Sequence, residues 1–287
     1  MLQQEIDSLA PSRDFSRRGF VKTAVGSGFA AAVLPVTAQT IKTDSEGLTV
    51  GEVMIPVGDF KMPAYRAQPA GKTGLPVVLV VSEIFGVHEH IADVARRFAK
   101  LGYMAIAPEL FVRQGDAQSY GEIAKLVSEV IAKVPDKQVM GDLDAAVAWA
   151  KANGGDTSKL GITGFCWGGR TTWMYAAHNA AVKAAVPWYG PVARSYFPGD
   201  KPALDVAANV KAAVLALYGG ADPGIPNDTV EKMMAAIKAA GNTKSELVIY
   251  PDTPHAFHAD YRPSYRKEQA EDGWKRAVAW LKANGVA

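Results

Sequence analysis

Cys166 is the residue of this sequence with the clearest capacity for covalent chemistry. It stands in the run GFCWGG that begins at Gly164, between a predicted strand over residues 160–164 and a predicted helix over residues 170–177. Glycines beside a nucleophile let a strand and a helix approach closely at a sharp turn, which forces the intervening side chain outward. The start of a helix also favours a thiolate, because its partial positive charge stabilises an anion. The pattern indicates a cysteine nucleophile.

Two further residues complete a nucleophilic triad. Asp222 follows a predicted strand over residues 212–218, and His255 follows a predicted strand over residues 245–250. The chain order is therefore nucleophile, acid and histidine, each after the carboxyl end of a strand. In this arrangement Cys166 attacks a carbonyl carbon and His255 transfers the proton. Asp222 fixes the imidazole tautomer and stabilises its charged form.

The loop after the predicted strand over residues 76–81 contributes to the same rim. Hydrolysis through a tetrahedral intermediate needs two backbone N–H groups for the oxyanion, and the sequence predicts them at Ile84 and Trp167. Glu83 either holds a proton near the thiol, repels a thiolate, or is an exposed loop acid. Tyr189, near the nucleophile turn, is assigned with Glu83 to the residues that support the site or contact the substrate.

The elements that must position these residues alternate between strands and helices. Apolar, β-branched runs predict strands, and apolar residues at helical spacing predict helices. The predicted strands cover residues 48–56, 61–67, 76–81, 103–107, 160–164, 182–186, 212–218 and 245–250, and the predicted helices cover residues 91–101, 119–133, 139–153, 170–177, 227–240 and 265–284. The first two strands form a hairpin. The alternation predicts an α/β fold with a mainly parallel open sheet, helices on both faces, and a ligand site at the carboxyl ends of the strands.

Length and composition limit the class of protein. The chain has 287 residues, of which 48% are hydrophobic and 21% charged, and this balance excludes disordered and fibrous classes. Lys and Arg total 31 against 29 Asp and Glu, with no basic run, so we expect no nucleic-acid partner. The single cysteine excludes an intrachain disulfide and a cysteine-based metal site.

The first 38 residues have the pattern of an export signal. The run RRGFVK begins at Arg17 and precedes an uncharged, mildly apolar stretch over residues 24–38 that ends in VTA. This pattern resembles a twin-arginine signal, and it is too short and too rich in Gly and Pro for a stable membrane span. We therefore expect residues 1–38 to direct export by the twin-arginine machinery to the periplasm, and residues 39–287 to form one domain. A frayed or membrane-anchoring amphipathic terminus is the alternative.

The sequence resembles the dienelactone hydrolase family, the carboxymethylenebutenolidase-like branch of the α/β hydrolases. The similar blocks are EIFG from Glu83, PELF from Pro108, GDL from Gly141, GFCWGG from Gly164, WYG from Trp188, GGAD from Gly219 and PHAF from Pro254. The resemblance covers nearly all of residues 45–285. It implies an α/β-hydrolase fold and a cofactor-free hydrolase with Cys166, Asp222 and His255 as its triad. It also implies that Glu83 interacts with Cys166 at rest and releases it when substrate binds.

The proposed reaction is hydrolysis of a lactone or small carboxylic ester through an acyl-thiol intermediate. Dienelactone itself is not expected as the preferred substrate, because members specific for it carry arginines at two places. One is just after the catalytic histidine, where this chain reads AFHAD after His255, and the other is in the helix over residues 119–133, which contains no arginine. Neutral esters should therefore compete well with carboxylate-bearing ones.

Two alternatives use the same residues differently. His88 and His90, with the neighbouring acids Glu83 and Glu89 and the histidines His255 and His258, could form a metal cluster. A His-x-His pair in a loop is more often solvated, and a catalytic metal needs ligands held by further contacts, so we expect no metal. A non-catalytic or thiol-sensing binding protein could retain the fold. The complete triad favours the enzyme.

Overall fold

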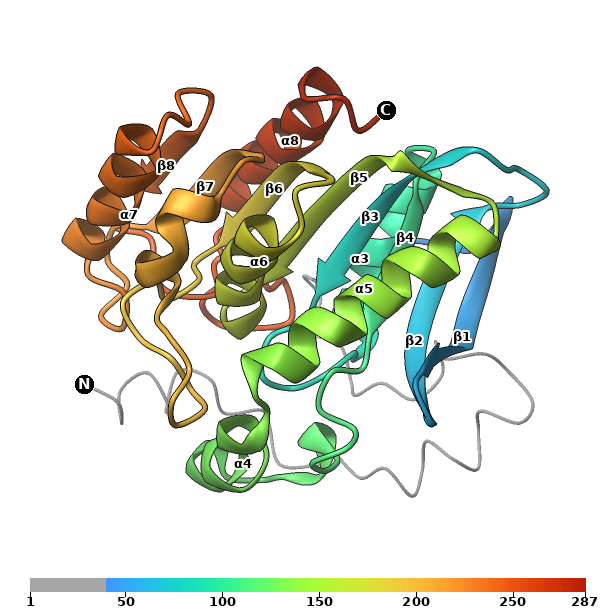
Figure 1. The fold of residues 1–287 in the computed structure, drawn as a ribbon, viewed down its shortest axis with the longest axis horizontal. Helices are drawn as coiled ribbons and strands as arrows, with labels where there is room; N and C mark the ends of the chain where they lie inside the picture. Colours follow the sequence, from blue (N-terminus) through green and yellow to red (C-terminus); the bar gives the residue numbers. More distant parts are fainter. Residues whose placement is uncertain (1–39) are drawn as a thin grey trace.

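The computed structural model describes residues 40–287, and the predicted export signal lies outside these residues. Eight strands form one sheet in the order β1-β2-β4-β3-β5-β6-β7-β8 (Figure 1). The strands are β1 (Leu48–Val57), β2 (Phe60–Pro69), β3 (Leu75–Val81), β4 (Met104–Pro108), β5 (Gly155–Phe165), β6 (Val182–Trp188), β7 (Ala213–Gly219) and β8 (Glu246–Tyr250). β2 is antiparallel to both of its neighbours, β1 and β4, and the other five pairs of adjacent strands are parallel, so the prediction of a mainly parallel sheet is confirmed.

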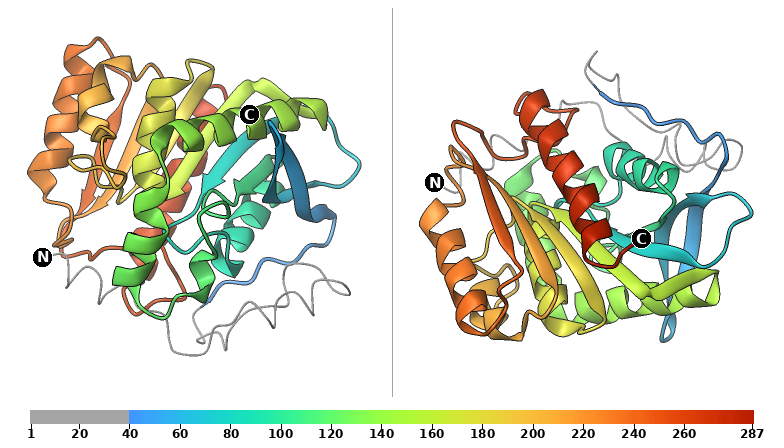
Figure 2. Two further views of the ribbon diagram at one scale, coloured as in Figure 1. Left: turned by 60° about the horizontal axis from the view of Figure 1, so that its bottom comes forward. Right: turned by 90° about the horizontal axis from the view of Figure 1, so that it is seen from above.

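Helices cover both faces of the sheet, as the alternating pattern predicts. They are α3 (Glu89–Lys100), α4 (Ile123–Glu129), α5 (Asp136–Ala152), α6 (Trp167–His178), α7 (Asn227–Ala239) and α8 (Lys267–Ala283), with short 3-10 helices η2 (Ala117–Ser119), η3 (Ile131–Lys133) and η4 (Ala203–Asn209). α3 and α8 lie on one face, and α5, α6 and α7 lie on the other (Figure 2). Because both faces are covered, the strands β3 and β4 consist of apolar residues alone.

The prediction of a single helix over residues 119–133 is wrong. The chain forms η2, α4 and η3 there, with extended backbone at Tyr120 and Glu122 around Gly121. Glycine has low helix propensity, which allows the chain to leave the helical conformation at this point. Helix α5 begins three residues earlier than predicted, at Asp136, and β5 extends five residues further back, to Gly155.

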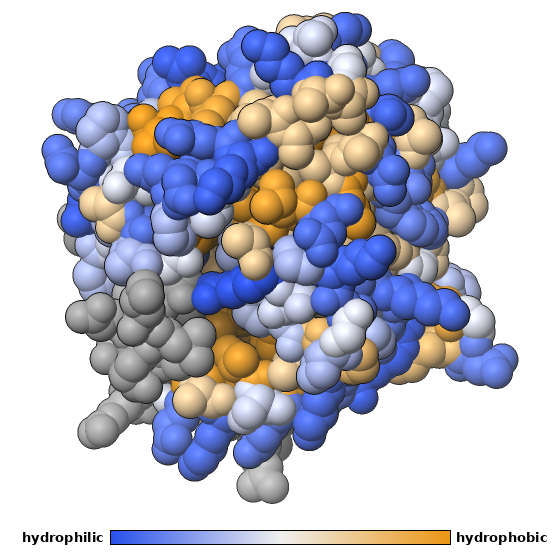
Figure 3. Space-filling view, turned by 60° about the vertical axis from the view of Figure 1, so that its left-hand side comes forward, coloured by the Kyte–Doolittle hydropathy of each residue, from blue (hydrophilic) through white to orange (hydrophobic). Residues whose placement is uncertain are grey.

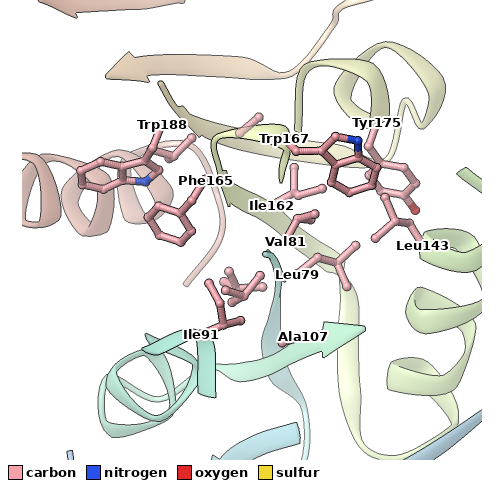
Figure 4. Close-up of a cluster of buried hydrophobic side chains, with 14 of the residues drawn as sticks. Leu79, Val81, Ile91, Ala107, Leu143, Ile162, Phe165, Trp167, Tyr175 and Trp188 are labelled. Carbon is pink, nitrogen blue, oxygen red and sulfur yellow. The ribbon is translucent and has the colours of Figure 1, made fainter. Parts of the chain in front are cut away.

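The core lies on both sides of β3 and β5, directly beneath the nucleophile turn. Phe165 and Trp188 are next to each other on one side, with ring centroids 5.6 Å apart, and Trp167 points to the other side toward Leu143 and Tyr175 (Figure 4). All five side chains are buried. Large, rigid aromatic groups therefore fix the backbone on either side of residue 166.

On the face drawn in Figure 3, hydrophilic side chains are spread among smaller apolar areas, several of which are recessed. Among residues 40–287, no helix is long and apolar enough to cross a membrane.

Candidate active site

Five neighbouring parallel strands present the polar residues of the candidate site at their carboxyl ends. Glu83 follows β3, Cys166 follows β5, Tyr189 follows β6, Asp222 follows β7 and His255 follows β8. The five strands are adjacent in the sheet in this order. The loops that carry these residues consequently share one edge of the sheet, where open α/β sheets bind their ligands.

The turn at Cys166 is strained and tightly packed. Cys166 has φ 56° and ψ −116°, and its N–H donates to the carbonyl oxygen of Trp188 at 3.0 Å. A Cβ atom on Gly168 would lie 2.4 Å from the carbonyl oxygen of Val81. Such strain persists only where surrounding structure enforces it, and it is concentrated at functional sites. The absence of a side chain at Gly168 lets the start of α6 approach the end of β3, which fixes Cys166 at the rim.

The structure brings Asp222 and His255 into direct contact. His255 Nδ1 lies 2.6 Å from Asp222 Oδ2, and the other oxygen of Asp222 accepts a hydrogen bond from the Gly224 N–H at 2.9 Å. The two loops are also joined through the backbone, because Ala221 N–H donates to the carbonyl oxygen of Thr253 at 3.0 Å. Asp222 is therefore fixed by two donors and orients the imidazole through Nδ1.

The charge state of His255 is controlled by its neighbours. Burial by itself lowers the pKa of His255, but interactions with Cys166 and then with the Asp222 carboxylate outweigh burial and raise this pKa well above its usual value. A histidine in this position holds a proton readily when the cysteine is a thiolate. The pair Cys166 and His255 can thus exchange a proton within the site.

Three polar atoms at this rim are buried and make no hydrogen bond to another part of residues 40–287. They are His255 Nε2, the Tyr189 hydroxyl and Glu83 Oε1. Tyr189 packs edge-on against the His255 ring at a centroid distance of 5.1 Å, and its backbone has a strained φ of 37°. Burial, and then the charges of Glu83, Tyr261 and Cys166, raise the pKa of Tyr189 well above its usual value, so the phenol is neutral. Unsatisfied buried groups of this kind suit a polar ligand.

Glu83 is held by residues other than Cys166. Its Oε2 lies 3.1 Å from His88 Nε2 and accepts a weaker hydrogen bond from the Tyr261 hydroxyl at 3.4 Å. Burial would raise the pKa of Glu83, but the hydrogen bond from His88, then the charges of His88, Arg262 and His90, lower it to about 2. The resting contact with Cys166 that the resemblance implies is not among the hydrogen bonds of the described residues; the partners of Oε2 are His88, from the same loop as Glu83, and Tyr261.

Arg262 is a site residue that the sequence analysis missed. Its side chain is buried, its Nε donates to the Tyr261 hydroxyl at 3.1 Å, and its guanidinium lies 5.0 Å from the Phe85 ring centroid. Burial lowers the pKa of Arg262, but Tyr261 and Glu83 outweigh burial and raise it. Arg262 stands seven residues after His255, in an irregular loop, and no spacing rule marks such a position.

The two predicted oxyanion donors lie on the elements that the sequence indicated. Trp167 is the first residue of α6, and Ile84 is in the loop after β3. Neither backbone N–H donates to a backbone acceptor in the described part of the chain. Helix geometry explains this for Trp167, because the first N–H groups of a helix have no partner within the helix.

The histidines considered as metal ligands contact separate carboxylates. His88 binds Glu83, and His90 Nδ1 lies 3.1 Å from Asp260 Oδ1. The other oxygen of Asp260 accepts a hydrogen bond from Arg97 at 2.7 Å. No group of three or more His, Cys, Asp or Glu side chains within residues 40–287 is arranged to hold a metal ion.

The sheet order, the strained turn after β5, and the rim that joins Cys166, Asp222 and His255 are those of an α/β hydrolase. The chain belongs to the dienelactone hydrolase family, whose model matches residues 62–285, and it is a carboxymethylenebutenolidase-like hydrolase. The fold class and the family predicted from the sequence are therefore confirmed.

The similarity to individual relatives extends over most of the chain. A Methylorubrum extorquens protein named "Putative carboxymethylenebutenolidase" is 58% identical over 291 residues, which cover 99% of this chain and 98% of that protein. The protein of the same name from Escherichia coli K12 is 51% identical and covers 92% of this chain and 97% of its own length. A crystal structure called "Putative Dienelactone Hydrolase" from Klebsiella pneumoniae is 52% identical, with a TM-score of 0.79 over 82% of this chain and 98% of its own.

Proposed function

We propose that residues 39–287 form a hydrolase that cleaves a lactone or small carboxylic ester through an acyl-thiol intermediate on Cys166. The contact that carries this proposal is the 2.6 Å pair between Asp222 and His255, which uses Nδ1 and leaves Nε2 for Cys166, the residue whose interaction with His255 helps to raise the pKa of the imidazole. The names of the relatives support the substrate class, because a carboxymethylenebutenolidase hydrolyses a lactone.

The first half-reaction transfers the acyl group to sulfur. His255 takes the thiol proton, and Cys166 Sγ attacks the carbonyl carbon to form a tetrahedral intermediate. The backbone N–H groups of Ile84 and Trp167 stabilise the oxyanion. When the intermediate collapses, the bond from carbon to the alkoxy oxygen breaks, and that oxygen receives the proton from His255. In a lactone the alcohol formed remains attached to the acyl chain.

The second half-reaction returns the enzyme to its starting state. His255 removes a proton from water, and the hydroxide attacks the acyl carbon. The carbon–sulfur bond then breaks, the carboxylic acid is released, and Cys166 regains its proton from His255. Asp222 stays ionised and stabilises the imidazolium in both steps. Tyr189 and Arg262 line the same rim and supply a neutral donor and a cation to the bound substrate.

The test uses a panel of lactones and activated esters, each assayed before and after treatment with iodoacetamide. Because Cys166 is the only cysteine of the chain, alkylation modifies one defined site. We expect alkylation and Cys166→Ala to abolish turnover, and Cys166→Ser to leave weak esterase activity at best. Full activity of the Cys166→Ala protein would exclude the thiol mechanism. Ligand binding without turnover in the unmodified protein would instead support a binding or thiol-sensing role.

We also propose that the protein is exported to the periplasm by the twin-arginine route. The support is the RRGFVK run from Arg17, followed by the uncharged stretch over residues 24–38. This route carries folded proteins, so the thiol of Cys166 can be enclosed in the folded domain before export.

A further inference from the structure

His88 lies in the site without a part in the proposed reaction. It is the residue before α3, and its ring is enclosed by other rings on several sides. Tyr261 packs edge-on at a centroid distance of 5.0 Å, Phe85 lies edge-on at 6.5 Å, and His90 is stacked at 6.1 Å. The orientation of the imidazole is therefore fixed before any contact with Glu83 is considered.

This fixed ring directs one nitrogen at Glu83. His88 Nε2 is 3.1 Å from Glu83 Oε2, whereas the second donor to that oxygen, the Tyr261 hydroxyl, is 3.4 Å away. Glu83 is 1% exposed, and its Oε1 is buried without a hydrogen bond to any of residues 40–287. A buried carboxylate is costly unless it is paired, so the shorter contact to His88 has the larger effect on its conformation.

Glu83 Oε1 is the carboxylate oxygen that neither His88 nor Tyr261 contacts, so it remains available to the groups that take part in the reaction. The charges of Glu83 and Cys166 both affect the pKa of the Tyr189 hydroxyl and the pKa of Arg262, so the two residues act on the same pair of neighbouring groups. A negative charge at a fixed place beside a thiol opposes thiolate formation, and the size of this effect depends on where the carboxylate is held.

We propose that His88 is a positioning residue, which binds Glu83 through Oε2 and so presents Oε1, in a fixed place, to the Cys166 side of the site. The proposal rests on the cysteine mechanism above, but its effect on the thiol is measurable without substrate. His88 itself touches no substrate in this scheme.

The titratable groups around the pair determine what loss of His88 would do. Glu83, His90, Tyr261 and Arg262 face His88, and burial, opposed by the hydrogen bond with Glu83, lowers the pKa of His88. The imidazole is thus neutral at pH 7 and acts as an N–H donor. Without this donor, burial of Glu83 is opposed by the charges of Arg262 and His90 and by the longer hydrogen bond from Tyr261, so the pKa of Glu83 rises from about 2.

The experiment measures the rate of iodoacetamide alkylation of the full chain from pH 4 to 9, which reports only on Cys166. His88→Gln places an amide N–H donor near the position of Nε2, and His88→Leu removes the donor. We expect the Gln variant to keep the profile of the unmodified protein. The Leu variant should gain an additional transition on the acid side of the profile, as Glu83 becomes protonated, with alkylation below that transition at least about threefold faster than in the unmodified protein.

The double variant His88→Leu/Glu83→Gln tests the assignment of that transition. It has no carboxylate at residue 83, so the added transition should disappear. An unchanged profile in His88→Leu, equal profiles in the Leu and Gln variants, or a transition that persists in the double variant would overturn the proposal. If His88→Leu does not fold, His88→Asn replaces it, because the shorter amide does not reach Glu83 Oε2 and should show the same transition. Ester hydrolysis by the same variants shows separately whether the cysteine mechanism holds.

Discussion

A Cβ atom on Gly164 would lie 2.3 Å from the carbonyl oxygen of Gly168, across the turn that carries Cys166. No side-chain rotation relieves this clash, because both groups are backbone. Gly164→Ala must therefore displace β5 or α6, and we expect it to lower the free energy of unfolding by about 1–3 kcal/mol and to impair activity. Urea denaturation and ester hydrolysis measure the two effects.

Gly141→Ala is the matched control for this substitution. Gly141 lies within α5, and a Cβ atom there has no neighbour within 4 Å. Alanine has the higher helix propensity, so this variant should be more stable by about 0.5–1 kcal/mol with unchanged activity. Equal effects of the two substitutions would show that the turn is not sterically limited.

Asp222 and His255 should behave as one unit in kinetics. Asp222→Asn and His255→Gln should each reduce kcat/KM by several orders of magnitude, and the double variant should be little worse than the poorer single variant, because each change disables the same proton transfer. The control is the surface pair of Asp144 and His178, whose atoms are 2.7 Å apart and whose side chains are 45% and 41% exposed. Its removal should leave kcat/KM unchanged. Additive losses at the buried pair would contradict the triad.

The fold could be predicted from the sequence because its strongest signals are local. Buried parallel strands such as β3 and β7 are unbroken apolar runs, and amphipathic spacing marks α3 and α8. The incorrect prediction of one helix over residues 119–133 has a physical cause. Only Ile123, Leu126, Val130 and Ile131 are buried between residues 119 and 133, so few tertiary contacts support a long helix around Gly121.

The site could be predicted only where chemistry fixes a residue relative to a strand end. Cys166, Asp222 and His255 each follow a strand, so topology alone brings them to one rim. The partners of Glu83 could not be predicted in this way. His88 is five residues away in a loop and Tyr261 is 178 residues away, and their contacts depend on how two irregular loops pack against each other.

We expect the selectivity between neutral and carboxylate-bearing substrates to depend on the balance between Glu83 and Arg262. The low pKa of Glu83 and the raised pKa of Arg262 mean that both are charged at pH 7, so their charges compensate near Cys166. Glu83→Gln leaves the cation uncompensated. Two substrates are compared: an ester that carries a free carboxylate, and the same compound with that carboxylate as its methyl ester. We expect Glu83→Gln to raise the kcat/KM of the anionic substrate relative to that of the neutral one by about tenfold. An unchanged ratio would mean that the substrate does not sense these charges.

Export should depend on the arginine pair at the N-terminus. The expected result for Arg17→Lys/Arg18→Lys is an unprocessed precursor that stays in the cytoplasm, while the domain itself remains active after cell lysis. Cell fractionation with activity assays measures both. The variant Lys42→Arg, outside the signal pattern, is the control and should be exported normally. Recovery of processed double variant in the periplasm would exclude this route.

His258 should make the protein less stable in mild acid. Its ring is stacked on Phe165 at a centroid distance of 5.0 Å and lies 4.6 Å from the Trp188 ring, and its Nδ1 is buried without a hydrogen bond among the described residues. Burial, and then the charges of His90 and Arg97, lower the pKa of His258 well below 6.5.

The sign of this effect follows from proton uptake. Below pH 6.5 the unfolded chain binds a proton at residue 258 that the folded protein does not. As the pH decreases below 6.5, this group therefore lowers the free energy of unfolding by up to about 1.4 kcal/mol per pH unit. His258→Phe keeps an aromatic ring in the stack and removes the titration. Between pH 6.5 and 5, where Glu83 with its lowered pKa remains ionised, the variant should therefore lose less stability than the unmodified protein. Urea denaturation at pH 7.5, 6.5, 5.8 and 5 tests this, and parallel pH dependences of the two proteins would show that His258 accepts a proton in the folded state.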